Sequence, residues 1–454
     1  MRVAVVGTGH VGLVTCASLA AVGHNVLGCD IDEEKVAALG EGKSPFYEPG
    51  LEELLRDGRA SGGLRFTSDL TEAARGAEVI FISVGTPPRS NGEANLLAVE
   101  RVAKSIAPFL QPGAVVVEKS TVPAGTAGRV RLTIELTRPD LRGRVAVVSN
   151  PEFLREGQAV EDAMKPARIL VGADSEMGLE AMRRLYKPFL LHGTHWIETD
   201  ITTAELAKHA CNAFLAMKIS YANALARICE LADADVRAVA EVMGTDARIG
   251  GAFLEAGLGY GGYCFPKDLA AFQRLSERLG YRFSLLREVA HVNAEAVEAA
   301  LAKVRESVWN LEEKRIALFG LAFKPGTDDV RLSPAIALAA RLLEEGASVV
   351  GYDPHAAMNA TKELPELEIA ESPYEAAAGA DAVVVCTGWD EFKTLDLLRL
   401  KEAMAAPVIV DGRNVLEPSE ITRNGFVYYP TGAAPRYPED VGISSARAEH
   451  GIPA

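Results

Sequence analysis

Short apolar runs alternate with stretches of helical spacing at the start of the chain, and this pattern predicts an α/β domain. The segment RVAVVG at 2–7 is a β-branched run ending in glycine. LVTCASLAAVG at 13–23 carries apolar residues at helical spacing, and HNVLGCD at 24–30 is a second apolar run. Strand, helix and strand within about 30 residues form the βαβ unit of a parallel sheet.

The same order of apolar runs returns in the last third of the chain. The corresponding pairs are 23–30 with 346–353, 76–86 with 379–389, and 114–121 with 407–414, while 314–324 takes the place of the first strand. The repeat is too degenerate for a solenoid. We therefore predict an α/β protein with two Rossmann-like, doubly wound domains, each built on a parallel sheet.

Strand signals vanish between these two domains. The segment 200–234 predicts one long spine helix that opens at Asp200, with Thr202 and Thr203 as capping candidates. Because it is apolar on most of its circumference, we expect it to be buried between the domains. The predicted boundaries are a first α/β domain at 1–198, a central helical domain at 199–305, a second α/β domain at 306–435 and a tail at 436–454.

Charge and composition narrow the function. The 454 residues include 47 basic and 62 acidic side chains, a formal charge of -15, which argues against a nucleic-acid partner. No apolar run approaches the ~18 residues of a membrane span, and the chain opens on a strand-like run instead of a signal peptide. The six cysteines lack zinc-like spacing. We expect free thiols, no metal site, no membrane partner and a cytoplasmic setting.

The first βαβ unit carries a dinucleotide fingerprint. Gly7, Gly9 and Gly12 form the G-x-G-x-x-G pattern between strand and helix, and Asp30 closes the second strand. The glycines let a pyrophosphate reach a helix N-terminus. The carboxylate can bind the adenosine ribose and would repel the extra phosphate of NADP, so NAD is favoured. The alternative is a structural turn beside a solvated acid.

Two further segments follow predicted strands of the same domain. Val84 and Thr86 lie in SVGTPP, and Ser120 and Thr121 lie in EKSTVPAGT. Ligands of such sheets bind at the carboxyl ends of strands, which makes these residues pocket candidates. Ordinary proline-containing loops are the alternative.

Two pairs of polar residues are spaced four apart. Glu152 and Glu156 would share one face if NPEFLREG were helical, although a solvated pair is the usual explanation. Lys208 and Asn212 lie among apolar residues of the predicted spine helix. A buried pair that needs partners and a snorkelling lysine with a capped amide both fit this pattern.

The segment GLGYGGYCFPKD at 257–268 combines clustered glycines with one thiol. A hydrophilic linker would not carry these aromatic residues, whereas a backbone packed closely against a substrate would need the glycines. Cys264 is then a candidate nucleophile, with Lys267 or Lys208 favouring the thiolate and Asp268 beside it. An inert, half-buried cysteine is the alternative.

These segments resemble the UDP-glucose/GDP-mannose dehydrogenase family from about residue 1 to 430. The blocks GTGHVG, NPEFLREG, AKHACNAFLAMKIS, GLGYGGYCFPKD, GLAFKPGTDDVRLSP and DGRN occur in the family's order, and CFPKD and AFKPGTDDVR are highly specific. The UDP-N-acetylsugar branch usually has a histidine before its cysteine and lacks this Pro-Lys-Asp. The resemblance implies an NAD-binding first domain and a UDP-sugar-binding second domain.

The resemblance implies a four-electron oxidation in which two NAD molecules convert the C6 alcohol of UDP-glucose to the carboxylate of UDP-glucuronate. Cys264 matches the nucleophile that holds a thiohemiacetal and then a thioester. Lys208 and Asn212 match oxyanion stabilisers, Asp268 and Thr121 match positions that handle water and its proton, and Glu152 matches an acid/base glutamate.

The resemblance also implies further residues of the cofactor site and of the substrate site. The predicted cofactor residues are Gly7, Gly9, His10, Val11, Gly12, Asp30, Lys35, Val84, Thr86, Ser120, Thr121, Glu156, Cys264, Lys267 and Arg331. The predicted substrate residues are Glu152, Phe153, Leu154, Lys208, Asn212, Arg248, Phe253, Tyr260, Gly261, Phe323, Lys324 and Arg413. Arg248 matches an arginine that reaches a neighbouring subunit in relatives, and a homodimer is expected.

Two positions depart from the family pattern. His10 stands where many relatives have Tyr, and we expect it to pack in the turn. Tyr263 stands where a Ser usually precedes the cysteine, so the phenol could narrow the pocket or hydrogen-bond the sugar. The alternatives are the same chemistry on GDP-mannose or a UDP-N-acetylhexosamine, a two-electron dehydrogenase with a structural Cys264, and a nucleotide-sugar sensor without turnover.

Overall fold

The computed structural model describes residues 1–438, which form two compact units. Unit 1 comprises Met1–Phe214 and Lys267–Phe283, and unit 2 comprises Leu215–Pro266 and the described chain from Ser284 onward. Each unit contains one sheet. The domain boundaries predicted at 198 and 305 stay a prediction, because the compact units divide the chain inside its helical region.

The sheet of unit 1 has eight strands in the order β3-β2-β1-β4-β5-β6-β7-β8. The first six are parallel, β7 pairs antiparallel to β6, and β8 runs parallel to β7. The order reverses between β1 and β4, which places the switch point of this doubly wound sheet there. The strands are β1 (Arg2–Val6), β2 (Asn25–Cys29), β3 (Leu64–Thr67), β4 (Val79–Ile82), β5 (Val115–Glu118), β6 (Ala146–Ser149), β7 (Arg168–Ala173) and β8 (His195–Thr199).

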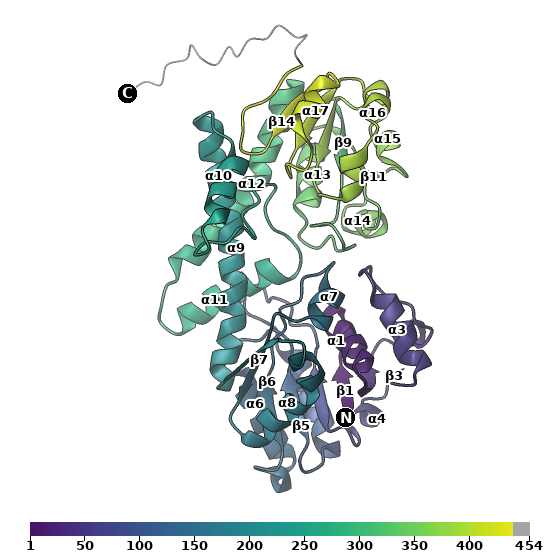
Figure 1. Ribbon diagram of the computed structural model, residues 1–454, viewed down its shortest axis with the longest axis vertical. Helices are drawn as coiled ribbons and strands as arrows, with labels where there is room; N and C mark the ends of the chain where they lie inside the picture. Colours follow the sequence, from purple (N-terminus) through teal and green to yellow (C-terminus); the bar gives the residue numbers. More distant parts are fainter. Residues whose placement is uncertain (439–454) are drawn as a thin grey trace. The chain divides into compact units, whose positions relative to one another are not determined.

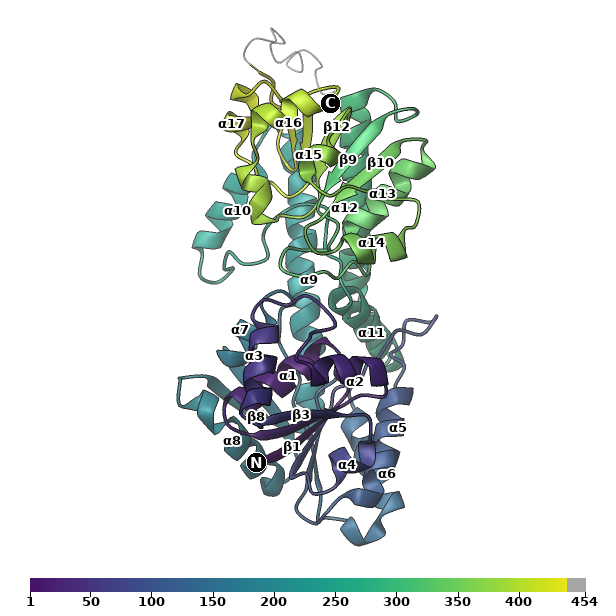
Figure 2. The ribbon, with the colours of Figure 1, turned by 90° about the vertical axis from the view of Figure 1, so that its right-hand side faces the viewer.

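Helices cover both faces of this sheet (Figure 2). One apolar cluster joins the sheet to α1 (His10–Ala21), α2 (Glu33–Gly40), α3 (Leu51–Ala60), α7 (Ala159–Met164) and α8 (Glu176–Leu190). A second cluster joins it to α4 (Leu70–Ala74), α5 (Leu97–Ile106) and α6 (Thr126–Thr137). Short 3-10 turns lie at Ala107–Phe109 and Pro139–Leu141. Strands buried on both faces explain why the runs in the sequence are continuously apolar.

Unit 2 repeats the six-stranded order, as β11-β10-β9-β12-β13-β14, and all pairs are parallel (Figure 1). The two predicted Rossmann-like sheets are therefore confirmed, and the repeated segments occupy equivalent strands. The strands are β9 (Arg315–Phe319), β10 (Ser348–Tyr352), β11 (Glu368–Ile369), β12 (Ala382–Val385), β13 (Val408–Asp411) and β14 (Val427–Pro430). The helices around them are α13 (Pro334–Glu344), α14 (Ala357–Glu363), α15 (Pro373–Ala376), α16 (Leu397–Ala403) and α17 (Pro418–Arg423), with a 3-10 turn at Asp390–Thr394.

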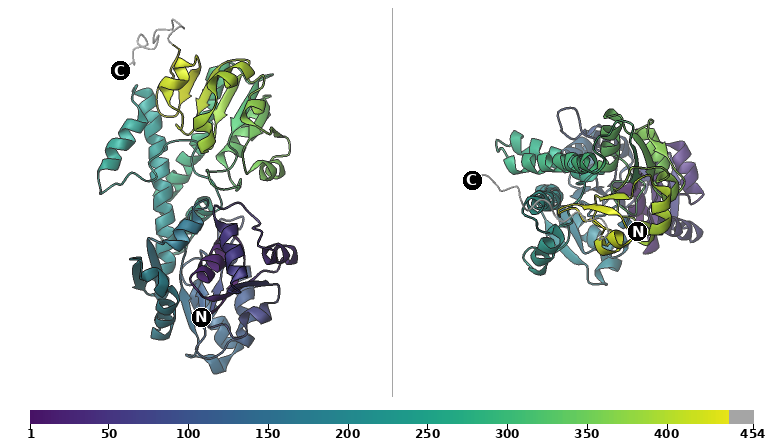
Figure 3. Two further views of the ribbon diagram at one scale, coloured as in Figure 1. Left: turned by 45° about the vertical axis from the view of Figure 1, so that its right-hand side comes forward. Right: turned by 90° about the horizontal axis from the view of Figure 1, so that it is seen from above.

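The predicted spine is α9 (Ile201–Leu231), one continuous helix (Figure 3). Asp200 caps it by accepting from the Thr203 amide and hydroxyl, at 2.8 and 2.6 Å, so the aspartate and not a threonine is the cap. The expectation of full burial is wrong for Tyr221 and Ile228, which are more than half exposed. The remaining central helices are α10 (Val236–Thr245), α11 (Cys264–Arg278) and α12 (Ser284–Val308).

The end of the described chain is paired, because Arg436 forms a β-bridge with Tyr428. Of the tail predicted at 436–454, residues 439–454 lie outside the described residues. Within residues 1–438 no helix has the length and apolar character needed to cross a bilayer. Within these residues, none of the six cysteines forms a disulfide.

Candidate functional site

The glycine turn of unit 1 is built by close backbone contacts. Gly7 has a φ of 95°, and a Cβ there would lie 2.5 Å from the Ser83 carbonyl oxygen. A Cβ on Gly12 would lie 1.8 Å from the Gly7 oxygen. Gly9 faces open space at the start of α1, where nothing lies within 4 Å of an added Cβ. The turn therefore leaves room for a phosphate at a helix N-terminus.

Asp30 lies beside this turn at the end of β2. Its Oδ2 accepts from the Thr8 amide at 2.9 Å, the Thr8 hydroxyl at 2.8 Å and the Lys35 ammonium at 3.0 Å. Burial favours the neutral acid, but these bonds outweigh it and lower the pKa of Asp30. The aspartate is thus an anion fixed at the place where the fingerprint predicts a ribose.

In the equivalent turn of unit 2, the aspartate is bonded to the turn itself. Leu321 and Ala322 are fully buried, and both donate their amides to Oδ2 of Asp353, at 2.7 and 3.0 Å. The indole of Trp389 donates to the same oxygen at 3.0 Å. The carboxylate that corresponds to Asp30 is therefore saturated by its own domain.

The pocket candidates after β4 and β5 contact one another. The Thr86 hydroxyl donates to the Thr121 carbonyl at 3.0 Å, and the Ser120 hydroxyl donates to the Val84 carbonyl at 2.9 Å. The Lys267 ammonium lies 3.4 Å from the Thr86 hydroxyl oxygen. The two loops are therefore tied together at the carboxyl edge of the sheet.

A dry polar cluster lies on α9 and α11 within unit 1. Lys208 is 3.0 Å from a Glu152 oxygen, and their side chains are 5% and 6% exposed. The Asn212 amide donates to Asp268 Oδ2 at 2.6 Å, and Lys267 is 2.6 Å from Asp268 Oδ1. Lys208 and Asn212 are thus buried with partners, which removes the snorkelling alternative.

The cations of this cluster act on Asp268. Burial opposes its charge, but the attraction of Lys267 and Lys208 outweighs burial and lowers the pKa of Asp268. The carboxylate is therefore a charged hydrogen-bond acceptor inside the protein. Phe153 is a further neighbour, with its ring 5.2 Å from the Lys208 nitrogen and 3.8 Å from the Arg168 guanidinium.

A second buried lysine, Lys119, lies next to this cluster. Its ammonium donates to Asn150 Oδ1 at 3.1 Å, and the Tyr186 hydroxyl donates to the same oxygen at 2.6 Å. Burial lowers the pKa of Lys119 to about 8, while the charge of Glu152 opposes that shift. The sequence analysis missed Lys119.

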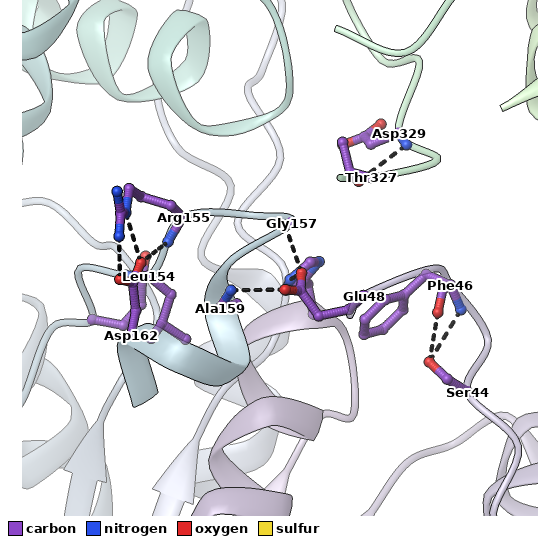
Figure 4. A network of polar contacts seen from close by, with 12 residues as sticks. Ser44, Phe46, Glu48, Leu154, Arg155, Gly157, Ala159, Asp162, Thr327 and Asp329 are labelled. Carbon is purple, nitrogen blue, oxygen red and sulfur yellow. Dashed lines mark hydrogen bonds and ion pairs between the residues drawn. The ribbon is translucent and has the colours of Figure 1, made fainter. Parts of the chain in front are cut away.

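The segment NPEFLREG is a loop and turn, so the condition under which Glu152 and Glu156 would share a helical face is not met. Glu48 holds the end of this loop by accepting from the amides of Gly157 and Ala159, both at 2.7 Å (Figure 4). Glu156 is partly buried at the turn. The Glu152 oxygen accepts from the Leu154 amide at 2.5 Å.

His10 also contacts Glu48. Its ring stacks on Phe46 with centroids 4.6 Å apart, and Nε2 lies 2.9 Å from Glu48 Oε2. The expected packing of His10 in the turn is present, together with this link from α1 through Glu48 to the 150–157 loop. Val11 follows His10 in the first turn of α1.

The glycines of the cysteine loop make room for this chain's own atoms. A Cβ at Gly257 would lie 2.6 Å from the Gly412 oxygen, and one at Gly261 would lie 2.3 Å from the Leu332 oxygen. At Gly262, whose φ is 76°, it would lie 2.7 Å from the Phe323 ring. Close packing of the loop within unit 2 explains the cluster that the sequence analysis assigned to a substrate.

Side chains of unit 2 fasten this loop from several directions. Asn293 of α12 accepts from the Tyr260 amide at 2.7 Å and donates to the Tyr260 carbonyl at 3.0 Å. Arg413 donates to the Gly259 carbonyl at 3.1 Å. Cys264, partly exposed, is the first residue of α11. The loop therefore presents the thiol from a fixed backbone.

The remaining predicted residues of unit 2 surround the loop or lie apart from it. The guanidinium of Arg331 lies 4.6 Å from the Tyr263 ring centroid and pairs with Asp329. The ammonium of Lys324 lies 5.6 Å from the Phe323 ring. Phe253, at a φ of 66°, contacts the Phe265 ring. The Arg248 side chain is 89% exposed and pairs only locally, with Asp246.

The residues that the sequence analysis missed are polar groups in apolar stretches of the chain. Glu205 and His209 on α9, Asn293 on α12 and Lys119 after β5 are all buried or half-buried and hydrogen-bonded. A polar residue on an apolar helix face is the available signal, since burial requires a partner. This signal identifies a residue that needs a hydrogen-bond partner, but it does not identify the partner.

Comparison with protein families gives three matches. Residues 1–190 match the NAD binding domain of the UDP-glucose/GDP-mannose dehydrogenase family. Residues 202–295 match the central domain of that family, and residues 317–418 match its UDP binding domain.

Individual proteins are similar over almost the whole chain. The UDP-glucose 6-dehydrogenase of Rhizobium meliloti (strain 1021) is 45% identical over 436 residues, 95% of this chain and 99% of that protein. The Pseudomonas aeruginosa enzyme of the same name is 43% identical, covering 95% and 97%. Among solved structures, a UDP-glucose dehydrogenase from Pyrobaculum islandicum is 36% identical with a TM-score of 0.88, covering 95% and 98%. A UDP-D-ManNAc dehydrogenase from Pyrococcus horikoshii is 28% identical with a TM-score of 0.83, covering 95% and 99%.

Proposed function

Because this chain belongs to the UDP-glucose/GDP-mannose dehydrogenase family, we propose that it oxidises UDP-glucose to UDP-glucuronate, using NAD twice and Cys264 as a covalent tether. The observation that carries the proposal is the dry cluster in which Lys208 and Asn212, one turn apart on α9, each contact a buried carboxylate. Donors held in a dry site suit a reaction that develops negative charge on oxygen.

The residues of unit 1 fit NAD. The open space at Gly9 admits a pyrophosphate to the N-terminus of α1, and the anionic Asp30 suits a ribose and disfavours a 2′-phosphate. When bound, NAD accepts the hydride in each oxidation. We assign Val84, Thr86, Ser120 and Thr121 to the same edge, because their loops are tied together there.

The first oxidation removes a hydride and a proton from the C6 alcohol, and Glu152 takes the proton. The Cys264 thiolate then forms a C–S bond to the aldehyde carbon, while Lys208 and Asn212 stabilise the resulting alkoxide. Loss of a second hydride from that carbon gives a thioester. The position of Cys264 at the start of α11 supports this role, because a helix N-terminus favours negative charge.

Hydrolysis completes the reaction. Asp268, kept anionic by its neighbours, takes a proton from water with help from Thr121. The water oxygen bonds to the thioester carbon, the C–S bond breaks, and a carboxylate and the cysteine are released. Lys324 and Arg413 are the cations that we assign to the diphosphate, with Phe323, Tyr260 and Gly261 nearby in unit 2.

The number of NADH molecules formed per UDP-glucose consumed tests this mechanism. We expect two NADH and an acid product, and one NADH with a released carbonyl compound would instead indicate a two-electron dehydrogenase. Cys264→Ser should abolish the acid product while UDP binding survives. A Cys264→Ser protein that turns over at the wild-type rate would exclude the covalent tether.

Assays with competing nucleotide sugars test which sugar the protein oxidises. The family name covers GDP-mannose, and one similar structure is a UDP-D-ManNAc dehydrogenase. We expect a kcat/KM for UDP-glucose at least ~100-fold above those for GDP-mannose and UDP-N-acetylhexosamines. Lys324→Ala should raise the KM for the UDP-sugar more than the KM for NAD, whereas equal increases would contradict its assignment.

We further propose that the chain forms a homodimer through the exposed face of α9 and α10. In unit 2, Tyr221 and Ile228 lie seven residues apart on α9, and Val242 on α10 is also largely exposed. Apolar residues so exposed are typical of a contact surface. Ile228→Glu should convert a dimer to a monomer in light scattering, whereas an unchanged mass would refute this face. The expected cytoplasmic setting stays a prediction.

A further inference from the structure

His209 is a buried side chain to which the proposed reaction gives no role. It follows Lys208 on α9 and is 1% exposed. Its Nε2 lies 3.0 Å from the Val122 carbonyl oxygen, and its ring stacks on Phe272 of α11 with centroids 6.0 Å apart. His209 therefore contacts both the loop after β5 and helix α11.

The contact with Val122 fixes the tautomer of the ring. A carbonyl oxygen can only accept, so Nε2 carries the proton and Nδ1 holds the lone pair. Burial lowers the pKa of His209, and the attraction of Asp268 and the hydrogen bond to Val122 only partly oppose this shift. The charge of Lys267 on α11 adds to the lowering. The ring thus serves as a neutral donor.

The loop that receives this bond carries Thr121. The Thr121 carbonyl accepts from the Thr86 hydroxyl, and the next carbonyl, that of Val122, accepts from His209. Glu205, one turn before His209 on α9, accepts from the amides of Gly125 and Ala127 at 2.5 and 2.8 Å. One face of α9 therefore holds the loop at two points.

The neighbouring face of α9 holds the other partner. Asn212 donates to Asp268 Oδ2, and the His209 ring packs on Phe272, one turn after Asp268 on α11. Because His209 touches both segments, it fixes the position of Thr121 relative to Asp268. Lys208 is held independently, by Glu152.

We propose that His209 is a positioning residue for hydrolysis of the thioester. It acts by donating from Nε2 to Val122, so that Thr121 and Asp268 stay aligned on the attacking water. The inference rests on the proposed function. It concerns the last chemical step, because Thr121 and Asp268, the residues assigned to that step, lie on the two segments that His209 contacts.

Two polar substitutions separate the effect of losing the Nε2 donor from the effect of losing the ring. The amide nitrogen of His209→Gln can take the place of Nε2, whereas that of His209→Asn lies near Nδ1 and cannot reach Val122. We expect His209→Gln to keep kcat within about threefold of wild type. His209→Asn should lower kcat by at least about tenfold, with a KM for UDP-glucose changed by less than about threefold.

Stopped-flow absorbance of NADH identifies the affected step. In His209→Asn, both hydride losses precede the slowed step, so a burst of two NADH per chain should precede slow turnover. Intact-mass measurement of the quenched protein should then find the glucuronyl thioester on Cys264. His209→Gln, which keeps a donor at the place of Nε2, is the matched control and should show no burst.

Three results would overturn the proposal. One is equal kcat for His209→Gln and His209→Asn. Another is a loss of kcat in His209→Asn without a burst, and the third is the same burst in His209→Gln. Failure of the proposed function gives a different signature, because the wild-type protein would then yield one NADH per UDP-glucose.

Discussion

Substitution of Lys208 by methionine tests how the buried charge pair is balanced. The change removes the ammonium 3.0 Å from Glu152 and leaves the carboxylate with little solvent contact. Breaking a buried pair from one side costs about 3–5 kcal/mol. Glu152 keeps the Leu154 amide at 2.5 Å and the attraction of Lys119, so we expect the lower end, about 3 kcal/mol at pH 7.5.

Equilibrium urea unfolding at pH 7.5 measures this cost in free energy of unfolding, with an unchanged m-value as the criterion of an unchanged mechanism.

The double variant supplies the decisive comparison. Glu152→Gln removes the stranded charge, so Lys208→Met with Glu152→Gln should recover most of the lost stability. Lys104→Met, which breaks an exposed pair with Glu100, is the matched control and should cost less than about 1 kcal/mol. If the double variant is as unstable as Lys208→Met alone, the lost packing of the lysine stem, and not the stranded charge, causes the effect.

Other consequences of the structure can be checked in the same way. Burial raises the pKa of Glu118, so the wild-type protein loses stability as the pH rises above the unfolded pKa of about 4.3. Relative to wild type, the free energy of unfolding of Glu118→Gln should therefore increase by up to about 1.4 kcal/mol per pH unit between pH 5 and 7. Parallel stability curves of the two proteins in urea unfolding would exclude this. Asp30→Ala should raise the KM for NAD by at least about tenfold and improve the use of NADP, and an unchanged ratio of the two kcat/KM values would contradict the role of this carboxylate. An added Cβ at Gly262 meets the Phe323 ring, whereas Gly250 has a similar φ of 70° and open space around an added Cβ. Gly262→Ala should therefore be less stable than Gly250→Ala by at least about 1 kcal/mol. Equal Tm values of the two variants would show that the ring moves aside.

The two sheets could be predicted because their strands are buried on both faces and leave continuous apolar runs. The fingerprint at Gly7 to Gly12 and the acid at Asp30 follow from a local rule about βαβ turns. Lys208 and Asn212 were ambiguous for a physical reason. An apolar neighbourhood shows that a polar group needs a partner, but Glu152 and Asp268 lie more than fifty residues away in the chain.

Residues whose role depends on tertiary contacts could not be predicted from the sequence. Asn293 and Glu48 hold loops that are distant in the chain, and their hydrogen bonds follow only from the packing of whole helices. The exposed residues Tyr221 and Ile228 show the opposite limit. An apolar helix face predicts that something covers it but does not say whether the cover belongs to the same chain.

The turn that follows β9 in unit 2 differs from the glycine turn of unit 1. In unit 1 an added Cβ at Gly9 meets open space, whereas in unit 2 Leu321 and Ala322 are fully buried and donate their amides to Asp353. Under the mechanism that we propose, both NAD molecules therefore bind to unit 1, one after the other. The covalent bond to Cys264 would then hold the half-oxidised sugar while one cofactor leaves and the next one binds. The time for which the carbon stays attached would depend on how fast the first cofactor leaves.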